Sequence, residues 1–319
     1  MNRPLVAITG ATGFVGSNVI EYLATKYEVM ALVRSKPADN FPYQHHQVDF
    51  QSQDSLSKSF AQLKPDVVLH LAISNEFNKL FADPVFAEDA YIGMTKRVLA
   101  ASESIDAHFV YISTDWVFSG VSHMVAEDTA PDPVNIYGEL KSGSEEVVKA
   151  STKRWAICRI GGVMGSHRLL PNMPRSQDVG FGYFVASIVD ALSAGQEFLV
   201  WQGDGVNEIA TVSLASEIAA SLARVIDQEA TGIFHLVGSE AITKRDLAHA
   251  VCDVFNLDAN LLKFGPAPSS EKFPQPVPKD SSLDSTKTRS TLGLEFTSPR
   301  VLLAAFKTER ETGRLSPLS

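Results

Sequence analysis

A tyrosine and a lysine four residues apart have side chains that could carry out proton transfer. Tyr137 and Lys141 lie at the start of a segment with helical spacing, so both side chains are expected on one helix face. A nearby ammonium group stabilises a phenolate and should lower the pKa of the tyrosine towards the working pH, as a general acid requires. Helices often contain this spacing by chance, so the spacing indicates a catalytic pair only if both residues also lie where the fold binds ligands.

Hydroxyl groups precede this pair at the end of an expected buried strand. Ser113 and Thr114 follow a run of apolar residues, and Asp115 and Trp116 come next. The carboxyl ends of parallel strands open onto the ligand crevice of an α/β sheet. We therefore expect these four side chains at the same edge of the sheet as the tyrosine and the lysine.

A glycine-rich turn near the N-terminus predicts a dinucleotide-binding site. Residues 9–16 read Thr-Gly-Ala-Thr-Gly-Phe-Val-Gly and lie between an apolar strand segment and a helical segment, as such a fingerprint requires. Its glycines permit a tight turn, close approach of a pyrophosphate and close helix–strand packing, and the helix N-terminus offers N–H groups to the anion. A turn that binds nothing is the alternative. We assign to the cofactor site Gly10, Thr12, Gly13, Phe14, Val15 and Gly16.

The end of the second expected strand bears on the choice of cofactor. An NAD site places an acidic residue there, whereas this chain has Arg34, which suits the 2′-phosphate of NADP. The sequence thus predicts NADPH as the preferred cofactor and leaves NAD open; a surface arginine without a ligand is the alternative. Residues 48–50, Val-Asp-Phe, end a further expected strand between the second and the one at 67–72. Asp49 and Phe50 are assigned to the adenine, although a loop cap is nearly as plausible for Asp49.

Short apolar segments alternate with segments of helical period in the first half of the chain. This alternation predicts an α/β fold with a doubly wound parallel sheet, the Rossmann fold. Strands are expected at residues 5–9, 28–33, 67–72, 109–113 and 155–160, and helices at 16–26, 52–63, 86–104 and 136–150.

The pattern becomes less regular after about residue 165. We divide the chain into a dinucleotide-binding domain, residues 1–165, and a smaller C-terminal α/β substrate-binding portion, residues 166–319, with an interleaved boundary. The second portion is expected to hold loops at 166–180 and 265–282, helices at 182–194, 214–227 and 244–255, and a strand at 232–237.

Composition excludes several classes of function. The chain has 319 residues with a formal net charge of −9 and no long basic run, so no nucleic-acid partner is expected. The longest apolar stretches fall far short of the roughly 20 residues that cross a bilayer, and we expect a cytoplasmic protein without a membrane partner. Cys158 and Cys252 are expected to be buried free thiols. No metal site is expected, because His45 and His46 lack further ligands and are interpreted as a solvated loop.

Together these motifs resemble the extended short-chain dehydrogenase/reductase family and, within it, the dTDP-4-dehydrorhamnose reductase branch. The turn at 9–16 resembles the family's T-G-x-x-G-x-x-G, and residues 137–141 resemble its Y-G-x-x-K. Residues 113–120, Ser-Thr-Asp-Trp-Val-Phe-Ser-Gly, are similar to the branch's S-T-D-Y-V-F-D-G, and residues 281–284 are similar to its S-x-L-D. The resemblance covers nearly the whole chain.

The resemblance implies a division of labour in the site. Tyr137 would be the proton donor, Thr114 a catalytic hydroxyl, and Lys141 the residue that holds the nicotinamide ribose and tunes the tyrosine. The implied reaction is hydride transfer to a keto carbon of a nucleotide-linked sugar. Further residues assigned to the cofactor are Leu71, Ala72, Ile73, Ser113, Tyr137, Lys141 and Ile160, and those assigned to the substrate are Thr114, Asp115, Trp116, Arg168 and Arg175. For the two arginines, which would bind a diphosphate, an ordinary surface position is the alternative.

Some positions depart from the branch. Residues 159–165 read Arg-Ile-Gly-Gly-Val-Met-Gly where the branch has R-T-S-W-V-Y-G, so the aromatic residue that lies against the sugar is missing. Tyr91 stands where the family has a helix-borne Asn, and Glu208-Ile209 aligns loosely with its P-T pair. The fold prediction does not depend on these positions, whereas the identity of the sugar does.

Three functions follow as hypotheses. The first is an NAD(P)H-dependent reductase of a nucleotide-linked 4-keto-6-deoxy sugar. The second is a sugar-nucleotide epimerase of the same family, which would keep NAD bound. The third is a non-catalytic dinucleotide-binding regulatory subunit, because a subunit of methionine adenosyltransferase is related to these reductases. Trp116 stands where a dehydratase has an extra Glu, which argues against that reaction. A homodimer is left open.

Overall fold

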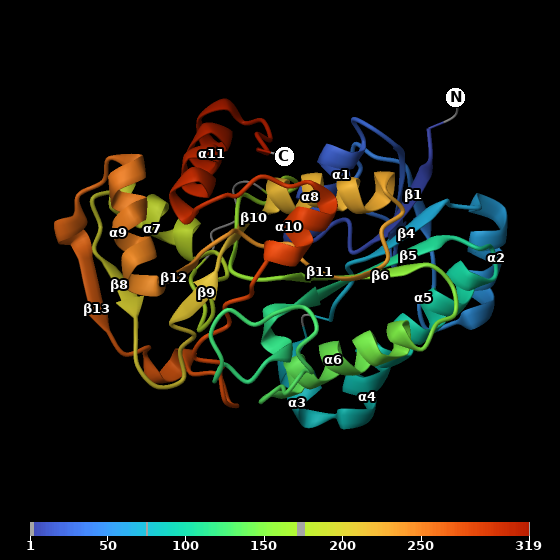
Figure 1. Ribbon diagram of the computed structural model, residues 1–319, viewed down its shortest axis with the longest axis horizontal. Helices are drawn as coiled ribbons and strands as arrows, with labels where there is room; N and C mark the ends of the chain where they lie inside the picture. Colours follow the sequence, from blue (N-terminus) through green and yellow to red (C-terminus); the bar gives the residue numbers. More distant parts are fainter. Residues whose placement is uncertain (1–2, 75, 171–175, 319) are drawn as a thin grey trace.

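A parallel sheet of seven strands forms the centre of the computed structural model (Figure 1). The structure describes residues 3–74, 76–170 and 176–318. The order across the sheet confirms the predicted doubly wound fold, because the chain starts in the middle and builds outward in both directions. From one edge to the other the strands are β11 (Gly232–His235), β6 (Trp155–Ile160), β5 (His108–Thr114), β4 (Val67–His70), β1 (Leu5–Thr9), β2 (Glu28–Val33) and β3 (His45–Gln47).

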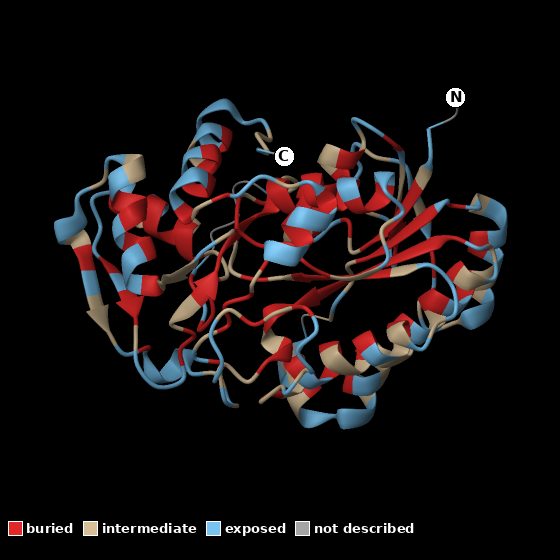
Figure 2. Cartoon of the chain, viewed as in Figure 1, coloured by how far each residue is buried: buried red, intermediate tan, exposed pale blue. Residues whose placement is uncertain are grey.

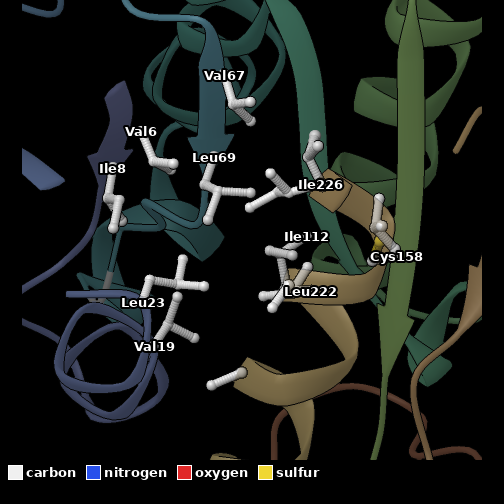
Figure 3. Packing of buried hydrophobic residues seen from close by; sticks show 14 of the residues in the cluster. Val6, Ile8, Val19, Leu23, Val67, Leu69, Ile112, Cys158, Leu222 and Ile226 are labelled. Carbon is white, nitrogen blue, oxygen red and sulfur yellow. The ribbon is translucent and has the colours of Figure 1, made fainter. Parts of the chain in front are cut away.

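Alternating side chains give the sheet two buried faces. Val6 and Ile8 belong to one hydrophobic core, whereas Ala7 between them belongs to the core on the opposite face. Figure 2 shows the strands as the most buried layer, and Figure 3 shows Leu23 and Leu222 packed on the first face. Helices on the first face are α1 (Phe14–Leu23), α8 (Ala215–Asp227) and, against α8, α10 (Thr286–Leu292); on the second face they are α2 (Gln53–Leu63), α5 (Met94–Glu103) and α6 (Ile136–Lys149).

Two segments differ from the sequence prediction, one at the edge of the sheet and one beside the glycine-rich turn. The histidine pair at 45–46 is not a loop but forms strand β3, where His46 Nε2 lies 3.1 Å from the hydroxyl of Ser59. An edge strand of three residues lacks the apolar alternation that identifies a strand in sequence. Strand β4 ends at His70 rather than at residue 72, because the chain turns there to pass the glycine-rich turn.

The single helix expected at 86–104 is divided into pieces. Asp83 caps α4 (Pro84–Glu88) by accepting from the N–H of Phe86 at 3.0 Å, and a π-helical turn η1 (Asp89–Gly93) joins α4 to α5. A π-turn inserts an extra residue into the helical register, and such turns often occur at functional sites. The short helix α3 (Phe77–Ala82), which lacks a clear sequence period, precedes them.

A smaller lobe holds the remaining elements. Its hydrophobic core lies between three helices and short paired strands. The helices are α7 (Phe184–Ser193), α9 (Lys244–Phe255) and α11 (Pro299–Thr312). The strand pairs are β7 (Val163–Met164) with β10 (Ser213–Leu214), β8 (Phe198–Trp201) with β13 (Leu262–Gly265), and β9 (Ile209–Thr211) with β12 (Ala241–Thr243). The 3₁₀ turns η3 (Ala259–Leu261) and η4 (Ser269–Glu271) come after α9, whereas η2 (Asp115–Val117) follows β5 in the sheet domain. The expected helices at 182–194, 214–227 and 244–255 correspond to α7, α8 and α9.

The two halves of the chain are interleaved in space. Strand β11 pairs in parallel with β6, and α8 packs on α1, so residues beyond 165 complete the central sheet and one of its faces. The smaller lobe therefore consists of two insertions, one before α8 and one after β11, together with the C-terminal helix α11 (Figure 1).

A buried ion pair fastens helix α6 to the sheet. Arg159 in β6 donates from Nε and Nη2 to the two carboxylate oxygens of Glu145 in α6, at 2.9 and 2.8 Å, and both side chains are fully buried. Arg159 also reaches the carbonyl oxygen of Glu127 at 3.3 Å. Paired donors of this kind fix geometry as well as charge.

Glu145→Ala should lower the free energy of unfolding by about 3–5 kcal/mol, because it leaves the Arg159 guanidinium buried without its counter-charge. Glu146→Ala is the matched control. It removes a surface pair with Lys149 on the same helix and should cost only about 0.2–1 kcal/mol. Equal losses of unfolding free energy in the two variants, measured by urea unfolding, would contradict the stabilising role of the buried pair.

Candidate active site

The glycine-rich turn is packed so tightly that two of its glycines admit no side chain. A Cβ at Gly16 would lie 2.1 Å from the carbonyl oxygen of Gly10, and one at Gly10, where φ is +71°, would lie 2.8 Å from the backbone of Leu71 and Ala72. Gly13 is exposed and caps the N-terminus of α1. The first N–H groups of α1 are thus held at the ends of β1 and β4, facing a space that suits a phosphate.

A pocket of about 1050 Å³ begins at this turn and follows the carboxyl ends of β1, β2 and β4. Pockets of this order bury small ligands and cofactors. Beyond the turn, its walls include the residues that the sequence analysis assigned to the adenine. The predicted site residues that line it are Gly10, Thr12, Arg34, Asp49, Phe50, Ala72, Ile73 and Arg168.

The far end of the pocket carries the charges that bear on cofactor choice. Arg34 is exposed at the end of β2, and its guanidinium has no hydrogen bond or ion pair within the described residues. Asp49 accepts from the N–H of Gln51 at 2.9 Å, so its carboxylate caps its own loop. Arg97, which the sequence analysis missed, donates to the carbonyl oxygen of Phe50 at 2.8 Å and also lines the pocket.

A buried histidine holds the segment that runs past the turn. His70 Nδ1 lies 2.7 Å from the hydroxyl of Thr9, which accepts from the N–H of Ala72 at 3.1 Å. Burial lowers the pKa of His70 to about 3, and the charge of Lys141 contributes in the same direction, so the ring is neutral. The other residues predicted to bind the cofactor lie outside the pocket lining. Phe14 packs against the ring of Tyr183, Val15 and Leu71 pack on the sheet core, Ile160 is half-buried, and Ser113 is buried with no partner for its hydroxyl among the described residues. The remaining members of this group are Gly13, Gly16, Tyr137 and Lys141.

Tyr137 lies in the first turn of α6. The helix starts there because Asn135 caps it by accepting from the N–H of Gly138 at 2.9 Å. A Cβ at residue 138 would lie 2.2 Å from the carbonyl oxygen of Trp116, so only glycine lets α6 approach the end of β5 this closely. The rings of Tyr137 and Trp116 meet edge to face with centroids 6.2 Å apart.

The structure brings the predicted catalytic hydroxyls together. Tyr137 lies beside Thr114 at the end of β5, and its interaction with the Thr114 hydroxyl opposes the rise in the pKa of the tyrosine. Thr114 in turn donates to Asp115 Oδ1 at 3.0 Å and accepts from the N–H of Trp116 at 3.3 Å. Asp115, predicted to contact the substrate, is buried behind Thr114.

Lys141 is turned towards the strand rather than towards a free ligand space. Its ammonium donates to the carbonyl oxygen of Ile112 at 2.5 Å and lies 4.4 Å from the ring centroid of Tyr111. Burial lowers the pKa of Lys141 to about 7. Burial also raises the pKa of Tyr137 to about 12, which its interaction with Thr114 only partly offsets. The expectation that the lysine lowers the tyrosine pKa is therefore wrong for this structure, because burial dominates at both groups.

Aromatic rings cover the side of Tyr137 that faces the smaller lobe. Trp116 packs edge to face on Phe273, with centroids 5.8 Å apart, and Phe273 packs likewise on Phe81 at 5.4 Å. Arg168 makes a two-point ion pair with Glu21, both distances 2.8 Å, beside the cofactor pocket. Arg175 lies outside the described residues. A role for either arginine towards a diphosphate stays a prediction.

Tyr91 is a site residue that the sequence analysis treated only as a departure from its family. It lies in the π-turn η1, and its ring meets that of Tyr137 edge to face at 6.2 Å. Its hydroxyl donates to the carbonyl oxygen of Ser74 at 3.0 Å, so it links the tyrosine to the loop after β4. The substitution of Asn by an aromatic residue was the available signal, but the π-turn that aims the ring has no sequence signature.

Two further properties hold for the residues that the structure describes. No group of three or more His, Cys, Asp and Glu side chains in these parts of the chain could hold a metal ion. No helix within them is long and apolar enough to span a lipid bilayer.

Both cysteines are buried free thiols, as expected.

Comparisons with known proteins agree with this geometry. A family model described as the RmlD substrate binding domain matches residues 4–310. The chain is 26% identical to methionine adenosyltransferase 2 subunit beta of Rattus norvegicus, over 92% of this chain and 84% of that protein. It is 25% identical to a probable low-salt glycan biosynthesis reductase of Haloferax volcanii, over 90% and 91%. A crystal structure of dTDP-4-dehydrorhamnose reductase from Bacillus anthracis in complex with NADP has the same fold, with a TM-score of 0.77, 20% identity and coverage of 97% and 100%.

Lys141→Met should stabilise the protein at neutral pH, because it removes a buried ammonium group. A lysine with a lowered folded-state pKa carries a penalty that is full below about pH 7 and fades as pH rises towards its ordinary value of about 10.5. Urea unfolding between pH 6 and 10 should therefore show a higher free energy of unfolding for Lys141→Met than for the wild type at low pH. The difference should shrink as the pH rises. Lys149→Met, at a surface pair on the same helix, is the control. A constant difference between wild type and Lys141→Met would refute the assignment.

Proposed function

Because this chain belongs to the RmlD substrate binding domain family, we propose that it is an NADPH-dependent reductase of a nucleotide-linked 4-keto-6-deoxy sugar. The observation that carries the proposal is the convergence of Tyr137 and Thr114 at the carboxyl end of β5, where α6 approaches the strand end closely. Ligands of doubly wound sheets bind at this edge. A reductase at 25% identity and a reductase with the same fold support the class of reaction.

The cofactor would lie along the pocket that starts at the glycine-rich turn. The N–H groups at the start of α1 fit a pyrophosphate, because Gly13 leaves them open to it. Arg34 would bind the 2′-phosphate and Phe50 would flank the adenine. Lys141, whose ammonium donates to the carbonyl oxygen of Ile112 here, would turn from it to hold the nicotinamide ribose. When bound, the reduced nicotinamide supplies a hydride to the keto carbon.

Tyr137 and Thr114 would act on the keto oxygen. As the carbon–oxygen double bond opens, the oxygen takes the Tyr137 proton, and the O–H bond of the tyrosine breaks as the new alcohol O–H bond forms. The pKa of about 12 means that Tyr137 carries its proton across neutral pH and is ready to act as an acid. Thr114 would donate a hydrogen bond to the same oxygen and stabilise its developing charge.

A second candidate is a dinucleotide-binding subunit without turnover. It is supported by the 26% identity to methionine adenosyltransferase 2 subunit beta over most of both chains. The absence of the branch's aromatic residue in segment 159–165 fits this candidate equally. The presence of Tyr137, Thr114 and Lys141 in one site favours the enzyme. Oxidation of NADPH with a panel of nucleotide-linked keto-sugars separates the two.

Arg34→Ala should weaken NADPH binding roughly 10- to 150-fold, which corresponds to about 1.5–3 kcal/mol for a charge-assisted hydrogen bond, and should leave NADH binding nearly unchanged. Fluorescence titration of both cofactors measures this. Arg300→Ala, at a surface ion pair with Asp253 in the smaller lobe, is the control and should affect neither. A wild-type preference for NADH, or equal losses for both cofactors, would rule out the 2′-phosphate contact.

Tyr137→Phe should lower turnover about 10²–10⁴-fold, the usual contribution of a positioned general acid, with little change in cofactor affinity. Only the hydroxyl is removed, whereas the ring packed on Trp116 and Tyr91 is kept. Tyr22→Phe, at a half-buried tyrosine of α1 packed on the sheet core, is the control. Near-wild-type turnover in Tyr137→Phe would disprove the mechanism, and failure of the wild type on every keto-sugar would favour the binding subunit.

A further inference from the structure

Arg97 joins two segments of the chain on the wall of the cofactor pocket. It lies in α5 and, like Phe50 and Asp89, lines that pocket. Its Nε donates to the carbonyl oxygen of Phe50 at 2.8 Å, and its Nη1 and Nη2 donate to the two carboxylate oxygens of Asp89 at 2.7 and 3.1 Å. The guanidinium group therefore ties the loop after β3 to the π-turn η1, in which Asp89 is the first residue.

The π-turn brings Asp89 within reach of Arg97. In an uninterrupted α-helix, residues eight apart lie about 80° apart around the axis, whereas residues seven apart lie about 20° apart and share a face. The extra residue in η1 shifts the register by one, so Asp89 comes to the face of Arg97. Gly93 lies between them. A Cβ there would lie 2.5 Å from Asp89 Oδ1 and 3.2 Å from Arg97 Nη1, so the pair in this geometry leaves no room for a side chain at residue 93.

The charge of Arg97 is balanced, which distinguishes it from Arg34. The hydrogen bond from Arg97 holds the pKa of Asp89 below its ordinary value, so the carboxylate is charged at neutral pH. The Arg97 side chain is 20% exposed, whereas Arg34 is exposed and its guanidinium has no hydrogen bond or ion pair within the described residues. Arg34 is thus the cation suited to a phosphate group, and Arg97 is suited to holding protein groups in place.

Phe50 is the group that Arg97 holds beside the pocket. Its ring lines the pocket and is half-buried against the hydrophobic core on the second face of the sheet. On one side of it, the N–H of Asp49 donates to the hydroxyl of Ser55 in α2 at 3.2 Å; on the other side, Arg97 holds the Phe50 carbonyl oxygen. A ring that is already fixed where a base stacks loses less conformational entropy when the base binds.

We propose that Arg97 is a positioning residue that fixes Phe50 against the adenine of the bound dinucleotide, and that Asp89 holds Arg97 in place. The inference rests on the dinucleotide site proposed above. It gives the π-turn a role, because η1 also carries Tyr91, whose ring packs on that of Tyr137. One turn thus supports both the adenine end and the tyrosine end of the site.

Fluorescence titration of NADPH and NADH with Arg97→Met and Arg97→Lys tests the proposal. Arg97→Met should weaken the binding of both cofactors by the same factor, about three- to tenfold, because both contain the adenine. Arg97→Lys should lose nearly as much, because a single ammonium group cannot reproduce the fork that joins Phe50 to Asp89. A loss confined to NADPH, or full recovery in Arg97→Lys, would show that Arg97 meets the phosphate by its charge and would overturn the proposal.

Asp89→Asn gives a test whose sign separates the two roles. It removes the counter-charge and one carboxylate acceptor, so a positioning Arg97 loses its support and both cofactors should bind about two- to fourfold more weakly. An Arg97 that bound the 2′-phosphate itself would be released by this change, and NADPH would bind more tightly. Tighter binding of NADPH, or unchanged binding of both cofactors, would refute the role of the pair.

Two halves of the cofactor distinguish positioning from a general loss of structure. In competition with NADPH, Arg97→Met should weaken AMP binding and leave the binding of reduced nicotinamide mononucleotide, which lacks adenine, unchanged. Equal losses for both halves would overturn the proposal. The matched control is Arg154→Met, because Arg154 likewise joins a carboxylate, that of Glu229 at 2.7 Å, to a backbone carbonyl, that of Asp106 at 3.1 Å, next to the start of β6. It should leave both cofactor affinities unchanged, and a loss equal to that of Arg97→Met would also overturn the proposal.

These measurements need no turnover, so they separate this inference from the reductase function. A wild type that binds NADPH but reduces no carbonyl compound would lose the reductase function, and the titrations would still decide the role of Arg97. A wild type that binds neither cofactor would overturn the dinucleotide site and this inference with it. Because the Asp89 side chain is 46% exposed, we expect Asp89→Asn to unfold at nearly the same urea concentration as the wild type, which keeps the test available if Arg97→Met does not fold.

Discussion

The buried ammonium of Lys141, bonded to the carbonyl oxygen of Ile112, holds the site together. An ammonium group inside a protein needs a partner, and this one finds it on strand β5, one turn of helix beyond Tyr137. Helix α6 can therefore neither slide nor rotate against the strand. The Arg159–Glu145 pair fixes its other end, and the close contact of Gly138 with Trp116 fixes its start. The position of Tyr137 follows from these three contacts.

Local patterns were enough to predict the sheet and the parts of the site that lie at strand ends. The glycine-rich turn, Thr114 and Tyr137 come to one edge because parallel strands all end there, and apolar runs identify those strands. Arg34 and Phe50 line the predicted pocket for the same reason. In such segments backbone geometry follows from residue type and spacing.

The features that sequence reasoning missed depend on contacts between distant segments. Strand β3 exists because β2 offers it an edge, not because residues 45–47 have a strand pattern. The pKa of Tyr137 is set by burial from several elements, which no spacing of two residues reveals. Tyr91 reaches the site through a π-turn, which has no sequence signature.

The return of the chain to the sheet has a consequence for how the protein can form. Strand β6 receives its outer neighbour β11 only after residue 235 has been made, and α1 is covered by α8 only after residue 227. A chain that stops at residue 165 would expose an unpaired strand edge and an apolar helix face. Residues 1–165 are therefore not an autonomous folding unit. During synthesis their sheet and helix face can be completed only after the segments that form α8 and β11 have been made.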